Sequence, residues 1–396
     1  MERPPEVNIP LIDVFTSQHL LPDTPQLASM REEFSRFAAQ SPGAPLRMPE
    51  VQGDGDYSAI GGNVIAKTIN DTLLAFAEGR RNSMDDFGDI DIILRRSSDF
   101  GITWDDIRIV HKHGNGQIGN PCPIIDQDTG RIFLLSCTGV EDETTIRTGS
   151  SHREIWLSYS DDDGETWCPE RNISPMARKD DWYWYATGPA SGIQIQSGTH
   201  RGRLVAPANH SFIKEDGLDE YACHSLYSDD KGETWQIGSV SGPGGNETQI
   251  AEVADDLLIQ DIRLQTHRTG YRAYRYSRDG GETWDEMRSH ESRPCTKTQG
   301  SIISLSQRPD GKHNILVTSN TSPIESRRAL NRRERLVARI STDGGHTWPM
   351  SYVVEPASAS YSNLVGIDDH RIGVFYSRHP RLSFRTFYIE DFGSEG

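Results

Sequence analysis

Short runs of alternating apolar and polar residues, separated by turns rich in glycine, aspartate and serine, cover most of the chain. Residues 155–159 and 272–276 are examples, and each run leads into a turn. A period of two over a strand-length segment is typical of a β-strand with one face in a core. The pattern therefore predicts an all-β protein.

One eight-residue pattern, Ser-x-Asp-x-Gly-x-Thr-Trp, occurs five times, beginning at Ser97, Ser160, Ser228, Ser277 and Ser341. Its aspartate can accept hydrogen bonds from nearby backbone N–H groups, its glycine permits a positive φ, and its tryptophan can bury the turn. The tryptophans are 63, 68, 49 and 64 residues apart, which suits one four-stranded blade per repeat. We expect these aspartates to hold turns and to take no part in catalysis.

The repeats predict a six-bladed β-propeller that forms a single domain over residues 1–396, with its core at about 57–390. Residues 18–56 stand outside the repeat as an extension or insertion, and 25–39 have apolar residues at helical spacing. Residues 11–17 have the composition of a strand that could close the ring against the last blade, formed by 371–376 and 381–389.

Composition excludes several classes of function. A net charge of −17 disfavours nucleic acid and anionic membranes as partners. The longest apolar runs are of strand length, so we expect no membrane span, and the N-terminus shows no signal peptide, which fits a cytoplasmic protein or a trimmed secreted form. The five scattered cysteines read as buried free thiols. An acidic ligand would need a local basic pocket.

The repeats resemble those of the sialidase (neuraminidase) family, in which such aspartate boxes decorate a six-bladed propeller; the resemblance covers about residues 57–390. It implies a retaining exo-α-glycosidase that releases terminal sialic acid or a related nonulosonic acid from a sialoglycoconjugate, with a tyrosine nucleophile. We expect no metal or other cofactor, because no histidine, cysteine and carboxylate cluster has ligand spacing and the nearest candidate, residues 126–130, fits a hairpin turn better. A neutral phenol avoids bringing an anionic nucleophile to an anionic sugar, but it needs a neighbouring base.

Residues 72–91 are the most specific match to the family, because an arginine ends a strand and a loop aspartate follows six residues later. The resemblance assigns Arg80 to the sugar pocket and Asp86 to general acid/base catalysis, with Asp85 as the fallback. An ion-paired surface turn is the alternative, since carboxylates are abundant here.

Two further segments supply the predicted nucleophile and its base. Residues 245–252 resemble the family strand that carries the base, which makes Glu247 that base, and the following strand ends at Arg263, a predicted ligand of the substrate carboxylate. Residues 358–364 resemble the nucleophile segment, which makes Tyr361 the nucleophile. A tyrosine in a strand can equally be a core or edge residue.

A further carboxylate-binding arginine should precede the last repeat, and counting back from it favours Arg333. Six arginines in the thirteen residues 327–339 would create a positive field in an acidic protein, although a solvated charge run is the alternative. Glu141 or Glu143 could also reach the pocket. Weaker resemblances to pocket segments occur at 120–123, 184–189, 206–210 and 298–301.

The chain departs from the family at two places. The first blade usually opens with Arg-Ile-Pro, but here the strand has Ile60 and Gly61. The nearest Arg-x-Pro begins at Arg47, and Arg47 could take the place of the missing arginine only if residues 50–58 loop out. The last blade usually carries Leu-Tyr-Glu, whose glutamate braces that first arginine, but here Ser377 takes its place. Loss of both charges together is expected because either one alone would be costly near the pocket.

These departures leave three functions open: an active sialidase-type enzyme, a diverged propeller that acts on another acidic sugar as a hydrolase or lyase, and a carbohydrate-binding propeller without catalysis. Retention of both Tyr361 and Glu247 favours an enzyme, because a binding protein has no need of a nucleophile and its base.

Overall fold

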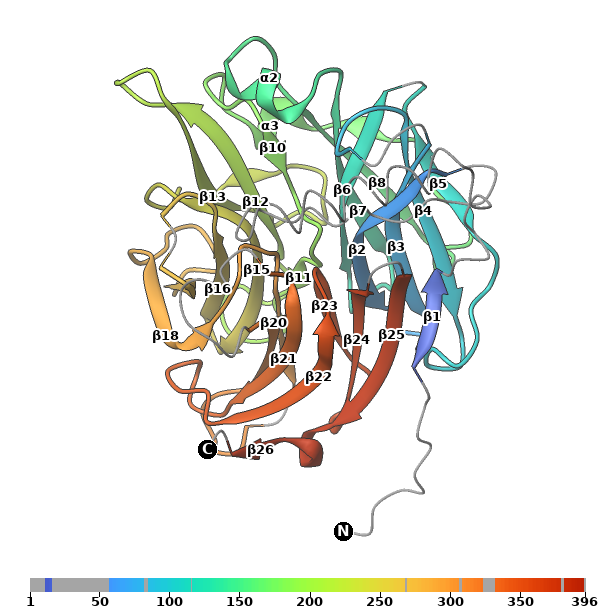
Figure 1. The fold of residues 1–396 in the computed structure, drawn as a ribbon, viewed down its shortest axis with the longest axis vertical. Helices are drawn as coiled ribbons and strands as arrows, with labels where there is room; N and C mark the ends of the chain where they lie inside the picture. Colours follow the sequence, from blue (N-terminus) through green and yellow to red (C-terminus); the bar gives the residue numbers. More distant parts are fainter. Residues whose placement is uncertain are drawn as a thin grey trace, which may run out of the picture.

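The computed structural model describes residues 11–15, 57–81, 85–114, 116–267, 269–305, 308–322, 332–378 and 381–394. The helix predicted within 25–39, and Arg47, lie outside these ranges. The described chain is almost entirely β-structure, and its sheets surround a common centre as in a β-propeller (Figure 1).

The first half of the described chain forms two sheets. The eight-stranded sheet contains β2 (Ala59–Lys67), β3 (Leu73–Arg80), β4 (Ile90–Ser97), β5 (Arg108–Lys112), β6 (Gln117–Ile125), β7 (Ile132–Gly139), β8 (Glu154–Ser160) and β9 (Arg171–Asn172). The next sheet contains β10 (Tyr185–Ala186), β11 (Ile193–Gln194), β12 (Leu204–Ile213), β13 (Asp219–Ser228) and β14 (Gln236–Ile237).

The second half forms three more sheets. They contain β15 (Gly245–Ala254), β16 (Leu257–Leu264), β17 (Tyr271–Ser277) and β18 (Arg288–Pro294); then β19 (Ser301–Leu305), β20 (Ile315–Thr321), β21 (Glu334–Ser341), β22 (Met350–Ser358) and β26 (Gly393–Ser394); then β23 (Ser362–Gly366), β24 (Arg371–Arg378), β25 (Arg381–Tyr388) and β1 (Ile12–Phe15). The short helices are α2 (Glu143–Arg147), α3 (Ser174–Ala177) and the 3₁₀ turn η3 (Ile389–Asp391).

Hydrogen bonding thus groups the described strands into five sheets, whereas the sequence predicted six blades, each a separate sheet. The difference arises in the eight-stranded sheet, where a single parallel bridge between Ile90 and Gln117 joins β2–β5 to β6–β9. The predicted closing strand is confirmed: β1 pairs antiparallel with β25, so the N-terminal segment completes the last sheet.

The aspartate boxes hold turns, as predicted. Asp99 accepts hydrogen bonds from the backbone N–H of Thr103 at 2.9 Å, from its hydroxyl at 2.6 Å, and from Ser97 Oγ at 2.7 Å. The same three contacts recur at Asp162, Asp230, Asp279 and Asp343. With these oxygens satisfied inside their own turns, the five aspartates are structural.

The tryptophans of the boxes also pack against strands outside their own hairpins. The ring centroid of Trp104 lies 5.6 Å from that of Phe384 in β25, and Trp167 lies 5.8 Å from Phe76 in β3. Gly101 has a φ of 92°, and a Cβ there would come within 2.2 Å of the Phe384 ring, so only glycine allows this approach. Burial of aromatic surface between blades explains why the box repeats at blade spacing.

Candidate active site

Tyr361 and Glu247 meet through their side chains. Tyr361 lies just before β23, Glu247 lies in β15, and the Tyr361 hydroxyl donates a hydrogen bond to Glu247 Oε1 at 2.5 Å. The peptide of Tyr361 is fixed because the Ser377 N–H donates to its carbonyl at 2.8 Å, and the N–H of Ser362 donates to Gln299 Oε1 at 3.0 Å. The predicted contact between nucleophile and base is therefore present.

Arg263, at the end of β16, contacts both members of this pair. Its Nη1 donates to the Tyr361 hydroxyl at 2.9 Å and also to Glu247 Oε2. The contact arises from sheet register: Gly245 pairs with Leu264 and Thr248 with Ile262, and the irregularity between these pairs sets Glu247 beside Arg263. The buried Nε of Arg263 has no hydrogen-bond partner among the described residues, which leaves a donor for an anionic ligand.

The local electrostatics keep the phenol of Tyr361 neutral. Burial and the adjacent Glu247 carboxylate raise the pKa of Tyr361, while Arg263 and Arg333 oppose this increase. Burial also works against the charge of Arg263, but Glu247 and Tyr361 outweigh it and raise the pKa of Arg263. The arrangement is a neutral phenol hydrogen-bonded to an adjacent carboxylate, and this is the pairing that an activated nucleophile needs.

Arg333 approaches the same tyrosine from another side. Its guanidinium carbon lies 5.4 Å from the centroid of the Tyr361 ring, and its Nη1 donates to Ser360 Oγ at 3.1 Å. Within the described part of the chain, Arg333 has no carboxylate within 4 Å. A partly buried cation held by neutral groups can bind an anionic ligand.

Arg80 and Asp86 form a second group on and beside β3. Arg80 Nη2 lies 2.6 Å from Asp86 Oδ1 and 2.9 Å from Glu78 Oε2. Arg80 and Glu78 are almost fully buried, whereas 55% of the Asp86 side chain is exposed. Asp86 is thus anchored by a buried arginine, and its side chain remains accessible to solvent.

Glu78 is a residue to which the sequence assigned no role. Its Oε1 accepts a hydrogen bond from the backbone N–H of Asn120 at 2.8 Å, and Gly62, with a φ of 57°, lies so close that a Cβ there would be 2.6 Å from the Glu78 carboxyl carbon. The sequence contained a signal for this contact: Glu78 and Arg80 are two positions apart in a predicted strand, so their side chains lie on the same face of β3.

Asn63 and Ser377 connect the two groups. Ser377 Oγ lies 2.8 Å from Asn63 Oδ1, and Asn63 follows Gly62, which packs against Glu78. Ser377 in turn holds the backbone of Tyr361. A neutral pair therefore occupies the place where the family resemblance implies a glutamate that braces an arginine.

Ile60, the first-blade position where that arginine was expected, is buried in an apolar cluster with Phe15, Tyr57 and Phe375.

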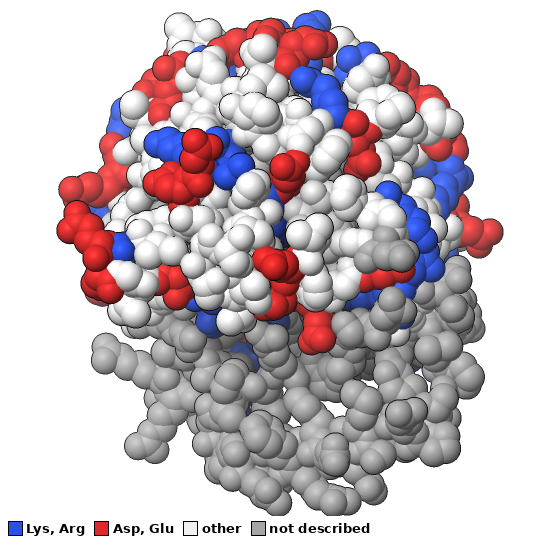
Figure 2. Space-filling view, turned by 90° about the horizontal axis from the view of Figure 1, so that it is seen from above, with Lys and Arg blue, Asp and Glu red and all other residues white. Residues whose placement is uncertain are grey.

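The arginine-rich segment 327–339 is described only from residue 332 onward. Figure 2 shows acidic and basic side chains interspersed over the described part of one face.

The weaker sequence assignments have mixed outcomes. Gln299, from the predicted segment 298–301, supports the peptide that follows Tyr361. Glu143 accepts a hydrogen bond from Tyr221, and Glu141 accepts one from Ser150 at 3.2 Å, so neither has a described contact with the six predicted residues. All five cysteines are free, but Cys168 is only half-buried, which corrects the prediction that all are buried.

The described residues contain no cluster of three or more histidine, cysteine or acidic side chains that could hold a metal ion. None of the helices in the same ranges has the length and apolarity to span a bilayer.

Comparison with known proteins confirms the family. The family of BNR repeat-like domains matches residues 71–374, and the chain belongs to it. A sialidase of Micromonospora viridifaciens is 28% identical over 338 residues, covering 81% of this chain and 50% of that protein. A sialidase of Bacteroides fragilis is 28% identical over 363 residues, covering 86% and 64%. The chain thus spans half to just under two thirds of these relatives.

A solved structure called Hadza microbial sialidase Hz136 superimposes with a TM-score of 0.71 at 27% identity, over 84% of this chain and 66% of that one. The resemblance to sialidases that the sequence indicated is therefore confirmed in both sequence and fold.

Proposed function

We propose that this protein is a retaining exo-α-glycosidase of the sialidase type, which releases a terminal sialic acid or a related nonulosonic acid. The observation that carries the proposal is the contact of Tyr361 with Glu247 and Arg263. A phenol bonded to a carboxylate and an arginine in a half-buried site has the groups of an activated nucleophile. Similarity to sialidases supports the same chemistry.

In the first step, Tyr361 attacks the anomeric carbon and its proton passes to Glu247 along the 2.5 Å hydrogen bond. The bond from the anomeric carbon to the leaving oxygen breaks, and Asp86 protonates that oxygen. In the second step the Asp86 carboxylate removes a proton from water, which attacks the anomeric carbon while the bond from that carbon to the Tyr361 oxygen breaks. The phenol then regains its proton from Glu247. Two displacements at one carbon retain its configuration.

Arg263 and Arg333 are proposed to bind the carboxylate of the sugar, with Arg80 shaping the pocket around Asp86. The neutral Asn63–Ser377 pair and buried Ile60 supply no third cation. A charged hydrogen bond contributes about 1.5–3 kcal/mol, so the site should hold a carboxylate more weakly than one with three arginines. Catalysis as proposed needs no metal or other cofactor.

The lack of a third cation among these described residues also favours a second candidate: a diverged propeller that acts on another acidic sugar, as a hydrolase or lyase. A binding propeller without catalysis is disfavoured, because it would gain nothing from the Tyr361–Glu247 contact.

The test is an activity screen against aryl glycosides of several nonulosonic acids and of uronic acids, followed by release of the aryl group. We expect turnover of at least one nonulosonic acid glycoside and loss of that turnover in Tyr361→Phe. Turnover of uronic acid glycosides alone would favour the diverged enzyme, and binding of the sugars without turnover of any would favour the binding protein.

We also propose that the propeller is a single domain of six blades. Division of the eight-stranded sheet at its one bridge, Ile90 with Gln117, gives two four-stranded sets, β2–β5 and β6–β9. With the four other sheets these would make six.

A further inference from the structure

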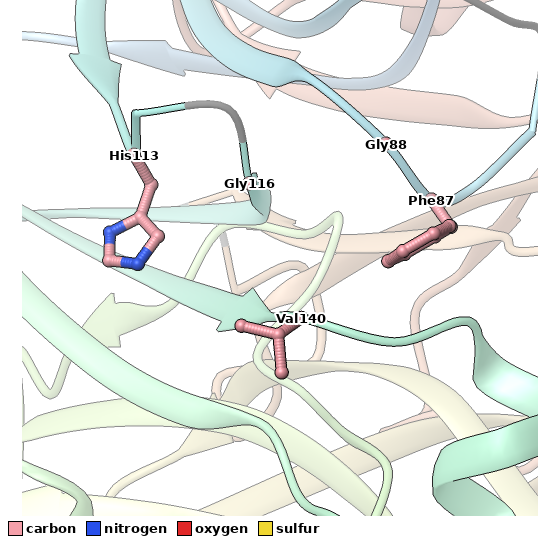
Figure 3. A pocket seen from close by; sticks show the side chains of 5 residues that line it. All are labelled: Phe87, Gly88, His113, Gly116 and Val140. Carbon is pink, nitrogen blue, oxygen red and sulfur yellow. The ribbon is translucent and has the colours of Figure 1, made fainter.

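A shallow hollow of about 370 Å³ lies beside the loop that carries Asp86. It is lined by Phe87, Gly88, His113, Gly116 and Val140. Figure 3 shows the rings of Phe87 and His113 on either side of the hollow, with Val140 between and below them. Three chain segments that are remote in sequence therefore contribute to one surface.

The hollow lies directly beside Asp86, the predicted general acid. Phe87 follows Asp86 in the chain, and Gln117, next to Gly116, donates a hydrogen bond from its side-chain amide to the Asp86 carbonyl at 2.7 Å. A general acid must lie at the leaving oxygen of its substrate. Whatever is attached to that oxygen must therefore lie near Asp86, on the side away from the nucleophile.

The lining is unusually apolar for an exposed surface. Phe87 is 36% exposed and Val140 is 72% exposed, which is the largest exposure of any bulky apolar side chain in the described ranges. The face of an aromatic ring carries negative partial charge and packs well on the polarised C–H groups of a sugar ring or on another ring. Apolar lining with few polar groups is typical of a binding site for a small ligand.

The charges around the hollow restrict what it can bind. Asp85 lies two residues before Phe87, and Glu141 and Asp142 follow Val140, whereas Lys112 adjoins the lining His113; the charge of Asp86 is balanced by Arg80 at 2.6 Å. Carboxylates on both sides repel an anionic group, so a neutral ring is favoured over an acidic one.

We propose that this hollow is the subsite for the leaving group, and that it takes a neutral sugar or aryl ring whose face packs on Phe87. The inference rests on the proposed glycosidase function. It predicts that the protein prefers substrates whose acidic sugar is joined to a neutral ring over substrates in which it is joined to a second acidic sugar.

The test compares Phe87→Ala with wild-type protein on two substrates of the same acidic sugar: its lactoside and its glycosyl fluoride. The fluoride has no ring to place in the hollow and needs little help from the acid. We expect kcat/KM for the lactoside to fall about tenfold, the scale of one aromatic contact. The value for the fluoride should stay within about twofold, because the acid and nucleophile are untouched.

Val140→Ser should show the same selective loss of kcat/KM for the lactoside, and Val140 is exposed enough that the change should not affect folding. Val240→Ser, which changes an exposed valine outside the hollow, is the matched control. The double variant Glu141→Gln, Asp142→Asn should raise kcat/KM for a substrate with an acidic leaving sugar; asparagine keeps the capping contact that Asp142 makes with Thr145.

The outcomes separate the two claims. The subsite alone would be overturned if the wild-type protein is active but Phe87→Ala and Val140→Ser lower kcat/KM equally for the lactoside and the fluoride, or lower it for neither. Wild-type protein that turns over neither the lactoside nor the fluoride would overturn the proposed function, and the subsite with it.

Discussion

The hydroxyl of Ser377 donates a hydrogen bond to the side-chain oxygen of Asn63, 2.8 Å away across 314 residues of sequence. Asn63 is fully buried; its amide donates to the carbonyl of Phe375, and its carbonyl accepts from Asn363. The pair thus belongs to the hydrogen bonding that joins β2 to the last sheet. Because both members are neutral and hydrogen-bonded to each other, the pair costs little to bury.

Ile60→Arg should therefore destabilise the protein without improving catalysis. Ile60 lies in an apolar cluster, and Ser377 offers no negative charge, so the new guanidinium would be buried unpaired at a cost of several kcal/mol. We expect a lower Tm and no gain in kcat/KM for a sialoside. Adding Ser377→Glu should recover part of the stability. A single variant with unchanged Tm and faster turnover would show that the pocket accepts a third arginine at this position.

Arg263→Ala should reduce kcat/KM by about 30- to 1000-fold, or roughly 2–4 kcal/mol. Because Arg263 contacts both Tyr361 and Glu247, kcat should fall as well as KM rise. Arg333→Ala should act chiefly on KM, since Arg333 lies over the Tyr361 ring and does not hold the base. Steady-state kinetics of both variants, with Arg333→Lys as the charge-preserving control, measure this difference. Equal effects on kcat in the two alanine variants would contradict it.

Asp261 should contribute to the pH dependence of stability. Its carboxylate is buried between Arg272 at 2.6 Å and Arg293 at 2.7 Å; burial raises the pKa of Asp261, but the two arginines outweigh this and lower it below its ordinary value. The stabilisation is thus complete above the unfolded pKa of about 3.9 and is lost as pH falls toward the lower folded value.

Asp261→Asn should cost about 3–5 kcal/mol at neutral pH, because it leaves two buried arginines without their partner, and the cost should shrink in acid. Denaturant unfolding between about pH 7 and about pH 2 tests this, since that range spans the unfolded pKa. Asp255→Asn is the control: it removes an exposed ion pair with Arg308 and should change stability by less than about 1 kcal/mol. Equal effects of the two substitutions would contradict the prediction.

Dialysis against a chelator should leave activity unchanged, because the proposed chemistry uses only Tyr361, Glu247, Asp86 and the arginines. In the turn at 126–130, the nearest candidate for a calcium loop, the Asp126 carboxylate already accepts hydrogen bonds from the Thr129 hydroxyl and the Gln194 side-chain amide. Activity that falls on dialysis and returns with calcium would contradict this prediction.

Sequence pattern was sufficient for the propeller because each aspartate box is a local structure: Asp99, Ser97 and Thr103 satisfy one another within seven residues. The Tyr361–Glu247 contact was accessible only through resemblance, since nothing in the local sequence shows that residues 114 positions apart will meet. The sequence did not predict the Asn63–Ser377 pair or the hollow at Phe87, because both depend on how strands far apart in the sequence pack together.

The central claim is that Tyr361 is the nucleophile, and trapping of the covalent intermediate tests it most directly. A 3-fluoro glycosyl fluoride of the acidic sugar should react with the protein and then hydrolyse slowly, since the 3-fluorine destabilises the positive charge that develops during both steps. We predict that mass spectrometry of the digested protein finds the added sugar on the peptide that contains Tyr361, and finds none in Tyr361→Phe. Label on another residue, or rapid consumption of the reagent with no labelled protein, would contradict the account.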